Sequence, residues 1–545
     1  LGQIAETAAA KVAAKRGKPY LIKNFTQKDT LEGLRKELKD NGISDTDSVY
    51  DPKTGKEFGK IMCGPQYFLK LFKTTDSNYS ARNVAKYDSY LQPAKGGEEG
   101  AKGVGYMEML GLLGSDARHN LREISTIKSE KNEDYWGKFQ RGEPLPKPKV
   151  TFATRKFFDY LKGAGINVKQ VDGHLVASPM TDVDTLGTSN GSIKNATILS
   201  AKTGAVEKGG LFDLAVTGGI TGNRWSHYKL AEPVLNPIFE KPVRTILGLT
   251  GTDVDNISAG SVGIRVIDKG NVSLHNTSTG DEIKRINTSL LYPAVLEQVK
   301  KAETVDTDDL LVGGDAFKAM LSHVDPVKEL HACRDAYKNT RAVAKKDSLA
   351  KKMKYLKGLI ASDITKPESA YIIQHVPVLP PTMRPVIDKG ANNIEFGDLN
   401  KLYKEMILSD QEGVRDLKGI LPDSELVDQR RGLYNSVKAV AGLGSAVGPS
   451  SSKADLKGII KSITGDEGPK MGMFHSRILK RNQDMSGRST IYAAPDVGFN
   501  QAKFPRDMMW SMFKMHIIRE LVKNGMRFPE AKMAYDKRTM AAQNM

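Results

Sequence analysis

The stretch RILKRNQDMSGRSTI, residues 477–491, decides how the rest of the 545-residue sequence is interpreted. Its cationic and small side chains are Arg477, Lys480, Arg481, Ser486, Gly487 and Arg488. Cationic side chains beside small residues suit a backbone that approaches phosphates closely. From charge alone, a phosphate-binding segment and a solvated basic loop are equally supported.

The composition indicates a polyanionic partner. The sequence has 81 Lys and Arg residues against 64 Asp and Glu residues, which gives a formal net charge of +17. Because an excess of this size attracts polyanions, we expect nucleic acid as the partner rather than a membrane or an acidic protein. A charge that serves solubility alone is the plainer alternative.

Several classes of protein are excluded. The 39% hydrophobic and 27% charged residues are ordinary for globular domains, and the length allows about three to five of them. No run of about 18 apolar residues predicts a transmembrane helix, and the polar N-terminal stretch is no signal peptide. Two cysteines, Cys63 and Cys333, exclude a disulfide framework and a cysteine-rich zinc site, so a reducing, intracellular environment fits.

The first third of the chain mixes helices and hairpins. Apolar spacing predicts an amphipathic helix at Thr30–Ile43, and Pro52 with Gly55 predicts a turn between two short strands. The run Tyr67–Phe72 is typical of a buried strand or helix. Further helices are expected at Tyr106–Gly114 and at Thr151–Val168, the second ending at Gly163 or Gly165.

The remainder is predicted to alternate irregular and helical parts, so the fold class is α+β with several domains. Residues 176–325 are rich in Gly, Thr, Asn and Val, which favours short strands and loops. A long helix rich in lysine is expected at Asp325–Ile360. Helices at Asp398–Leu408 and Ser424–Val440 predict an antiparallel hairpin, either a docking arm or an ordinary packed pair, before a flexible loop at Gly442–Lys453.

No self-contained active site stands out. The paired carboxylates lie in turn-like settings where caps explain them without a metal: Asp45/Asp47, Asp182/Asp184, Asp253/Asp255 and Asp306/Asp308/Asp309. The sequence lacks a G-x-x-x-x-G-K-[ST] phosphate loop and an H-E-x-x-H motif. The glycine-rich stretch Lys95–Gly105 is a plain linker or, with Lys95 and Lys102, a second loop for a phosphate chain.

Taken in order, these segments resemble the multisubunit DNA-dependent RNA polymerases. The first part is similar to the end of a beta subunit. Five segments carry this similarity: LGQIAET (1–7), VYDPKTGKEFGKIMCGPQYFLKLFK (49–73), SARNVAKYDSYLQPAKGGEEGAKGVGYMEML (80–110), LREISTIKSEKNE (121–133) and KGAGINV (162–168). It departs from the family at Val104, where an arginine is usual.

The second part resembles the start of a beta-prime subunit. It is carried by LVASP (175–179), SNGSIKNATILSAKTGAVEKGGLFD (189–213), HYKLAEPVLNPIF (227–239), VPVLPPTMRPV (376–386), the basic stretch and FPRDMMWSMFKMHIIRELVKNG (504–525). The four-cysteine zinc module that the family usually carries after GGLFD is missing. The two resemblances nearly touch around residues 169–175, which implies a fusion with almost no linker.

The resemblance implies part of the two-barrel polymerase architecture, divided as 1–174 (beta anchor and clamp), 175–385 (beta-prime clamp without the zinc module), 386–457 (lid, coiled-coil arm and rudder) and 458–545 (switch and start of the barrel). The lid would be Ile387–Phe396 and the rudder Gly442–Lys457. The expected nucleic-acid contacts are Lys480, Arg481, Arg488, Arg477, Ser486, Gly487, Lys95, Lys102 and Arg384. Arg384 would alternatively brace the base of the lid. Arg430 and Arg431 would dock an initiation factor.

The resemblance also implies that the chain has no catalytic or metal-binding residue of its own. Mg²⁺ would be held by the aspartate motif of a partner beta-prime chain, with the rest of beta as a further partner. The division of subunits is most similar to the split polymerases of giant bacteriophages, which implies the host cytoplasm, the phage nucleus or the virion as location. A phage structural protein that reuses polymerase-like segments, or a stand-alone nucleic-acid enzyme using Asp306 and Asp308, are the alternatives.

Overall fold

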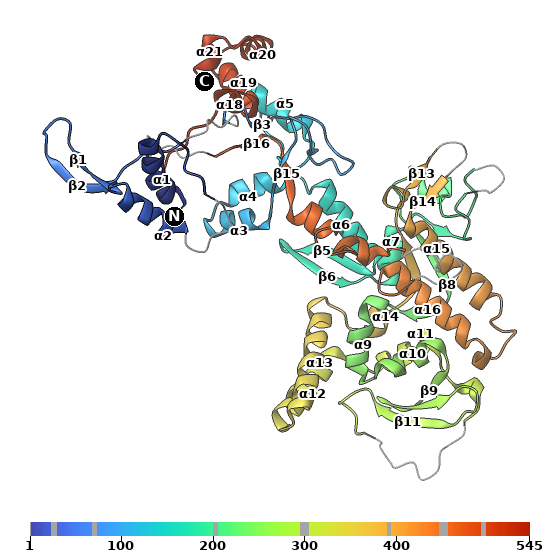
Figure 1. The fold of residues 1–545 in the computed structure, drawn as a ribbon. Helices are drawn as coiled ribbons and strands as arrows, with labels where there is room; N and C mark the ends of the chain where they lie inside the picture. The colour runs from blue at the N-terminus through green and yellow to red at the C-terminus, as the bar shows by residue number, and fades with distance from the viewer. Residues whose placement is uncertain are drawn as a thin grey trace. The chain divides into compact units, whose positions relative to one another are not determined.

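The computed structural model describes residues 2–22, 30–67, 74–199, 205–294, 305–389, 394–445, 456–491 and 497–545. The chain forms two compact units. One comprises Leu1–Tyr79 with Ser489–Pro505, and the other comprises Ser80–Arg488 with Arg506–Met545 (Figure 1). In these described ranges, no helix has the length and apolar character needed to cross a membrane.

The first unit holds two packed helices and a hairpin. Helix α1 (Gly2–Arg16) and helix α2 (Thr30–Asp40) bury alanine, valine and leucine side chains against each other. Strands β1 (Thr46–Tyr50) and β2 (Glu57–Met62) pair antiparallel, with Gly55 at a φ of 67° in the turn. The predicted helix and hairpin are therefore confirmed. Of the apolar run Tyr67–Phe72, only the exposed Tyr67 lies within the described residues.

The larger unit begins with short strands and helices. These are β3 (Tyr79–Arg82), β4 (Lys102–Val104), α3 (Tyr106–Gly114), α4 (Arg118–Ser125), α5 (Glu133–Arg141) and α6 (Phe152–Gly163). The Thr151 hydroxyl accepts a hydrogen bond from the Thr154 amide and so caps α6. Helix α6 ends at Gly163, and Gly165 follows with a φ of 96°, as predicted. Helix α3 is also confirmed, although none of its residues is buried.

The two polymerase-like parts of the sequence meet in a single hairpin. Strand β5 (Ile166–Val171) pairs antiparallel with β6 (His174–Pro179), and Val171 lies opposite His174. Asp172 and Gly173 form the two-residue turn, with φ angles of 48° and 80°. Positive φ at both positions is the geometry for which Asp-Gly is favoured in tight hairpins. The predicted boundary between residues 174 and 175 falls inside β6.

The main core lies in the larger unit and is built on two three-stranded sheets. One has the order β12 (Ile372–Val378), β8 (Ser226–Leu235), β7 (Ser192–Ile193). The other has the order β11 (Glu282–Asn287), β10 (Asn271–Asn276), β9 (Val262–Asp268). Alternate side chains of β8 are buried over most of its length, the pattern of a strand with one face on a core.

The prediction of strands and loops alone for residues 176–325 was wrong, because short helices alternate with the strands there. They are α7 (Asp182–Thr188), α8 (Leu214–Thr217), α9 (Glu240–Leu247), α10 (Gly251–Ala259) and α11 (Gly313–Ser322). Capping boxes at Thr181 with Asp184 and at Thr250 with Asp253 start two of them. Composition concealed these helices, since Thr, Asp and Gly serve there as caps and stops.

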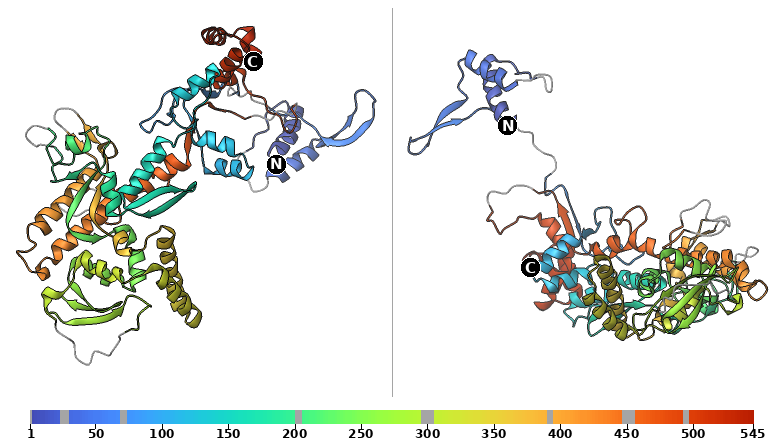
Figure 2. Two further views of the ribbon diagram at one scale, coloured as in Figure 1. Left: turned by 180° about the vertical axis from the view of Figure 1, so that it is seen from behind. Right: turned by 90° about the horizontal axis from the view of Figure 1, so that it is seen from below.

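The predicted long lysine-rich helix is in fact two helices. Helix α12 (Pro326–Asn339) and helix α13 (Val343–Ala361) lie side by side as an antiparallel pair, as Figure 1 and both views of Figure 2 show. Between them Glu329 and Lys352 form an ion pair of 2.8 Å. The chain turns at residues 340–342, where Thr340 adopts an extended backbone.

The predicted helix pair is confirmed as α15 (Asp398–Leu408) and α16 (Val427–Ala441), which pack together. A π-helical turn at Ser409–Arg415 and a 3-10 turn at Asp423–Glu425 connect them. Of the predicted lid, β13 (Val386–Asp388) and β14 (Ile394–Phe396) pair antiparallel, while residues 390–393 lie outside the described residues. Residues 446–455 of the predicted flexible loop and rudder also lie outside them.

The C-terminal part returns to the N-terminal elements of the same unit. Its elements are α14 (Pro367–Tyr371) before the sheet strand β12, then α17 (Ile459–Thr464), β15 (Arg481–Gln483), β16 (Ser486–Ser489), α18 (Arg506–Met512), α19 (Lys514–Lys523), α20 (Phe528–Asp536) and α21 (Met540–Gln543). Strand β15 pairs with β4, and α19 packs against α5 (Figure 1). The mixed α+β class is confirmed, with small sheets throughout.

Candidate nucleic-acid interface

The basic stretch folds as a sharp bend held by N-terminal residues. A π-helical turn at Phe474–Leu479 leads into β15, and Met485 then takes a φ of 48°, so the chain reverses into β16. The Asp484 amide donates to the Lys128 carbonyl at 2.7 Å, and the Met485 amide donates to the Asn83 carbonyl at 3.2 Å. A positive φ at a residue other than glycine costs of order 1 kcal/mol. The two hydrogen bonds hold the bend despite that cost.

Two cations of the stretch face solvent. Lys480 and Arg488 are exposed, and neither forms an ion pair with any carboxylate in the described part of the chain. Lys95 is also exposed, and its pKa is lowered by burial of its amine and by the charges of Lys480 and Arg477. Lys95 of the glycine-rich loop therefore lies near Lys480 and Arg477 of the basic stretch.

Pairing of β4 with β15 joins the two predicted phosphate-binding loops. Lys102 lies opposite Gln483, and its amide donates to the Ser486 hydroxyl at 3.1 Å. The glycine-rich loop is folded back on itself, since the Ala101 amide donates to the Ala94 carbonyl at 2.9 Å. The loop is therefore tightly folded, and of the two predicted alternatives, a plain linker and a loop for a phosphate chain, this folding favours the second.

Arg481 faces the interior. Its guanidinium donates to two carbonyls, those of Ile478 at 3.1 Å and Ser125 at 2.6 Å, and to the hydroxyls of Thr151 and Thr154 at 3.1 Å each. Burial lowers its pKa. Because protein oxygens already accept these hydrogen bonds, the side chain braces the start of α6. It offers no free pair of donors to a phosphate.

Arg384 is also committed to the protein. It is 1% exposed and donates to the carbonyls of Leu379 and Leu211 and to the Asn400 side chain, at 2.7, 2.6 and 2.9 Å. Its guanidinium lies 4.7 Å from the centre of the Phe212 ring. Of the two roles predicted for it, these contacts favour the bracing of the segment before β13.

Arg477, Ser486 and Gly487 shape the interface more than they present ligand groups. Arg477 pairs with Asp88 and lies over the Tyr90 ring. The Ser486 hydroxyl donates to the Gln483 carbonyl at 2.7 Å. A Cβ atom on Gly487 would lie 2.5 Å from Met508 Cε and 2.7 Å from Met512 Sδ, so a larger residue here would require these methionine side chains of α18 to move.

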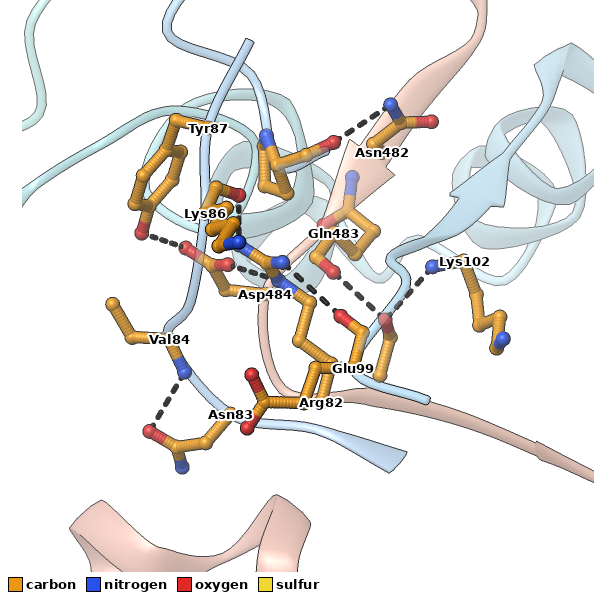
Figure 3. A network of polar contacts seen from close by, with 12 residues as sticks. Arg82, Asn83, Val84, Lys86, Tyr87, Glu99, Lys102, Asn482, Gln483 and Asp484 are labelled. Atoms are coloured by element: carbon orange, nitrogen blue, oxygen red, sulfur yellow. Dashed lines mark hydrogen bonds and ion pairs between the residues drawn. The ribbon is translucent and has the colours of Figure 1, made fainter. Parts of the chain in front are cut away.

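The residues that hold the bend were missed by the sequence reasoning. Arg82 and Asp484 form an ion pair of 2.8 Å, and the Tyr87 hydroxyl donates to the other Asp484 oxygen at 2.7 Å (Figure 3). Burial raises the pKa of Asp484, against the opposing effect of its Tyr87 and Arg82 hydrogen bonds. Arg82 and Tyr87 lie in the stretch 80–110 that carries the beta-subunit resemblance, and this was the available signal.

The two residues predicted to dock an initiation factor differ in their exposure. Arg430 is 4% exposed and forms a bidentate ion pair with Glu232, at 2.8 and 2.9 Å, and a further contact of 2.6 Å with Asp423. Arg431 is exposed and, among the residues that the structure describes, pairs with Asp428 alone, at 3.0 Å. Only Arg431 therefore presents its charge to a partner.

The acidic clusters serve as caps and brackets. Among the residues that the structure describes, no group of three or more His, Cys, Asp or Glu side chains is placed to hold a metal. Asp182 accepts from the amides of Gln374 and His375, Asp184 and Asp253 cap α7 and α10, and Asp306 caps a 3-10 turn. These contacts agree with the prediction that helix caps and turns account for these carboxylates.

Comparison with known proteins relates the chain to the multisubunit RNA polymerases. The family model described as RNA polymerase Rpb2, domain 6, matches residues 1–99. The beta′ subunits of DNA-directed RNA polymerase from Chlamydia trachomatis, Chlamydia muridarum and Chlamydia felis are 27% identical over 308 residues, 55% of this chain and 21% of theirs. The chain thus spans about a fifth of the length of these relatives. Together the matches support the assignment of this chain as a subunit of a multisubunit RNA polymerase.

Proposed function

We propose that the chain is a subunit of a DNA-directed RNA polymerase that joins the end of a beta subunit to the start of a beta-prime subunit. It would form the clamp, lid, rudder and template-contacting switch. The observation that carries the proposal is the β4–β15 pairing with the Arg82–Asp484 ion pair, which ties the beta-like stretch 80–110 to the basic stretch 477–491. Two exposed cations then remain on a bend that the protein holds firmly.

Lys480 and Arg488 would contact phosphates of the template strand, supported by Lys95 and Lys102. Hydrogen bonds from ionised donors to phosphate are shorter and about twice as strong as neutral ones, and an arginine can donate two in parallel. Such contacts position the strand without reading its sequence. Arg481 and Arg384 would act behind this surface, where they hold the backbone.

Nucleotide addition would take place on a partner chain. In this family the catalytic Mg²⁺ ion is held by the aspartate motif NADFDGD, which this sequence does not contain. Mg²⁺ stabilises the attacking and leaving oxygens of phosphoryl transfer. The partners would be chains with the rest of beta and beta-prime, together with template DNA and nascent RNA. The division of subunits favours a giant bacteriophage as source and the infected host cell as location.

Affinity purification through a tag on this chain, followed by native mass spectrometry, tests the proposal. We expect stoichiometric partners, one with the aspartate motif, and Mg²⁺-dependent RNA synthesis from a DNA template by the purified complex. The isolated chain should synthesise no RNA. Recovery of the chain alone, or only with capsid proteins, would contradict the proposal, and so would Mg²⁺-dependent activity of the isolated chain.

A further inference from the structure

We propose that Arg82 is a positioning residue that couples the two basic loops of the interface, residues 95–102 and 480–488, through its single guanidinium group. The inference rests on the proposed function and deepens it, because Arg82 would contact no nucleic acid itself. It would set the spacing between cations that do.

Each nitrogen of the Arg82 side chain reaches a different segment. Nε donates to the Asp484 carboxylate at 2.8 Å, Nη1 donates to the Glu99 carbonyl at 3.2 Å, and Nη2 donates to the Lys86 carbonyl at 2.8 Å (Figure 3). The side chain is 1% exposed. A planar, rigid donor group of this kind fixes the relative positions of its acceptors more tightly than a flexible ammonium does.

The three acceptors lie within or beside the basic loops. Glu99 lies between Lys95 and Lys102, and Asp484 lies between Lys480 and Arg488. The guanidinium therefore joins the glycine-rich loop to the bend of the basic stretch at points inside each loop. Because phosphates lie at regular intervals along a strand, cations on both loops contact one strand together only when this spacing is kept.

Asp484 completes the coupling. Its carboxylate is fully buried, and its two oxygens accept separately from Arg82 and from the Tyr87 hydroxyl. The Arg82 guanidinium also lies 5.4 Å from the centre of the Tyr87 ring. A buried carboxylate depends strongly on its partners, since loss of one leaves charge uncompensated. Tyr87 thus supports Arg82 by holding the same acceptor in place.

The test measures binding of the full chain, alone and in its complex, to fluorescein-labelled DNA with a melted region, by fluorescence anisotropy over a range of KCl concentrations. The Lys480→Ala/Arg488→Ala double variant removes direct contacts. We expect it to bind at least tenfold more weakly and to lower the slope of log affinity against log salt by about one per lost phosphate. Arg82→Lys should weaken binding about fivefold with a lower slope, and Tyr87→Phe about twofold.

A second triad in the same unit supplies the matched control. The Tyr228 hydroxyl donates to Asp410 at 2.8 Å, and Arg415 pairs with the same carboxylate at 2.8 Å. This triad links β8 to the π-helical turn and includes no residue of either basic loop. Tyr228→Phe and Arg415→Lys should leave both affinity and salt slope unchanged, although they remove contacts of the same kind.

The outcomes separate the inference from the function beneath it. If Lys480→Ala/Arg488→Ala binds like the unchanged protein, the phosphate-contact function is wrong and the coupling fails with it. If that variant is weakened while Arg82→Lys and Tyr87→Phe match their controls, the coupling alone is wrong. Tyr87→Phe keeps the ring and removes one hydroxyl, so it remains informative even if the Arg82 variant does not fold.

Discussion

Helix α16 and the basic stretch 477–491 each place one arginine inside the protein and another outside it. In α16 the two are neighbours in the sequence: Arg430 forms an ion pair with Glu232 in the interior, and Arg431 forms one with Asp428 at the surface. In the basic stretch, Arg481 donates to four protein oxygens, whereas Arg488 is exposed. A cluster of cations therefore contains two populations: buried cations that hold the fold, and surface cations that a ligand can reach.

The largest expected effect is on Arg430. Arg430→Ala should lower the free energy of unfolding by about 3–5 kcal/mol, because it leaves Glu232 buried without its main partner. Arg431→Ala should cost less than about 0.5 kcal/mol, as exposed ion pairs do. Urea unfolding followed by tryptophan fluorescence measures both, since Trp225 packs against the same core. Equal losses of unfolding free energy for the two variants would contradict this distinction between buried and exposed arginines.

The basic stretch offers the next test. Arg481→Ala should cost about 2–4 kcal/mol, because several buried acceptors lose their donor. Arg488→Ala should leave stability unchanged within about 0.5 kcal/mol and shorten the lifetime of the open complex, more so at higher salt. Trp136, which is buried beside Met485, reports unfolding of this region. An unchanged lifetime for Arg488→Ala would count against the switch assignment.

A smaller effect concerns pH. Burial alone would raise the pKa of Glu232, but the hydrogen bonds and charges of Arg430 and Lys418 outweigh it and lower the pKa overall. A carboxyl with a lowered folded-state pKa adds stability above its unfolded pKa, about 4.3, and loses it as pH falls through the folded value. Glu232→Gln should therefore cost about 1–3 kcal/mol at pH 7.

The dependence on pH supplies the control for that variant. The difference in unfolding free energy between Glu232→Gln and the unchanged protein should shrink as the pH falls below the unfolded pKa of about 4.3 and level off below the lowered folded-state pKa, where the carboxyl is protonated in both states. Arg431→Ala, which changes an exposed pair, should show little of this trend. A difference for Glu232→Gln that stays constant down to about pH 3 would show that lost packing, rather than lost charge, explains its effect.

Local signals predicted a large part of the fold. Helix α2, the β1–β2 hairpin, the end of α6 and the α15–α16 pair follow from apolar spacing, glycine and proline. The short helices between the central strands were not predicted. Two of them begin at Thr181 and Thr250, in segments whose composition resembles loops. The Asp172–Gly173 turn was readable as a hairpin signal and was overlooked.

The candidate site was predicted as a set of residue types, and its working geometry was not. Lys480, Arg481 and Arg488 stand close together in the sequence, so charge alone selects all three. Which of them faces solvent depends on acceptors supplied by Ser125, Thr151 and Thr154. Those acceptors come from segments far away in the chain, and no local pattern indicates them.

The amino-acid sequence was enough to establish the basic character of the protein, the order of its polymerase-like segments and its most strongly patterned helices, because charge, periodicity and turn chemistry are local properties. Only the tertiary structure decided that Arg481, Arg384 and Arg430 are internal braces, and that Arg82 joins two basic loops through Asp484. The physical reason is the cost of burying a charge. A cation enters the interior only where distant parts of the chain together supply enough acceptors.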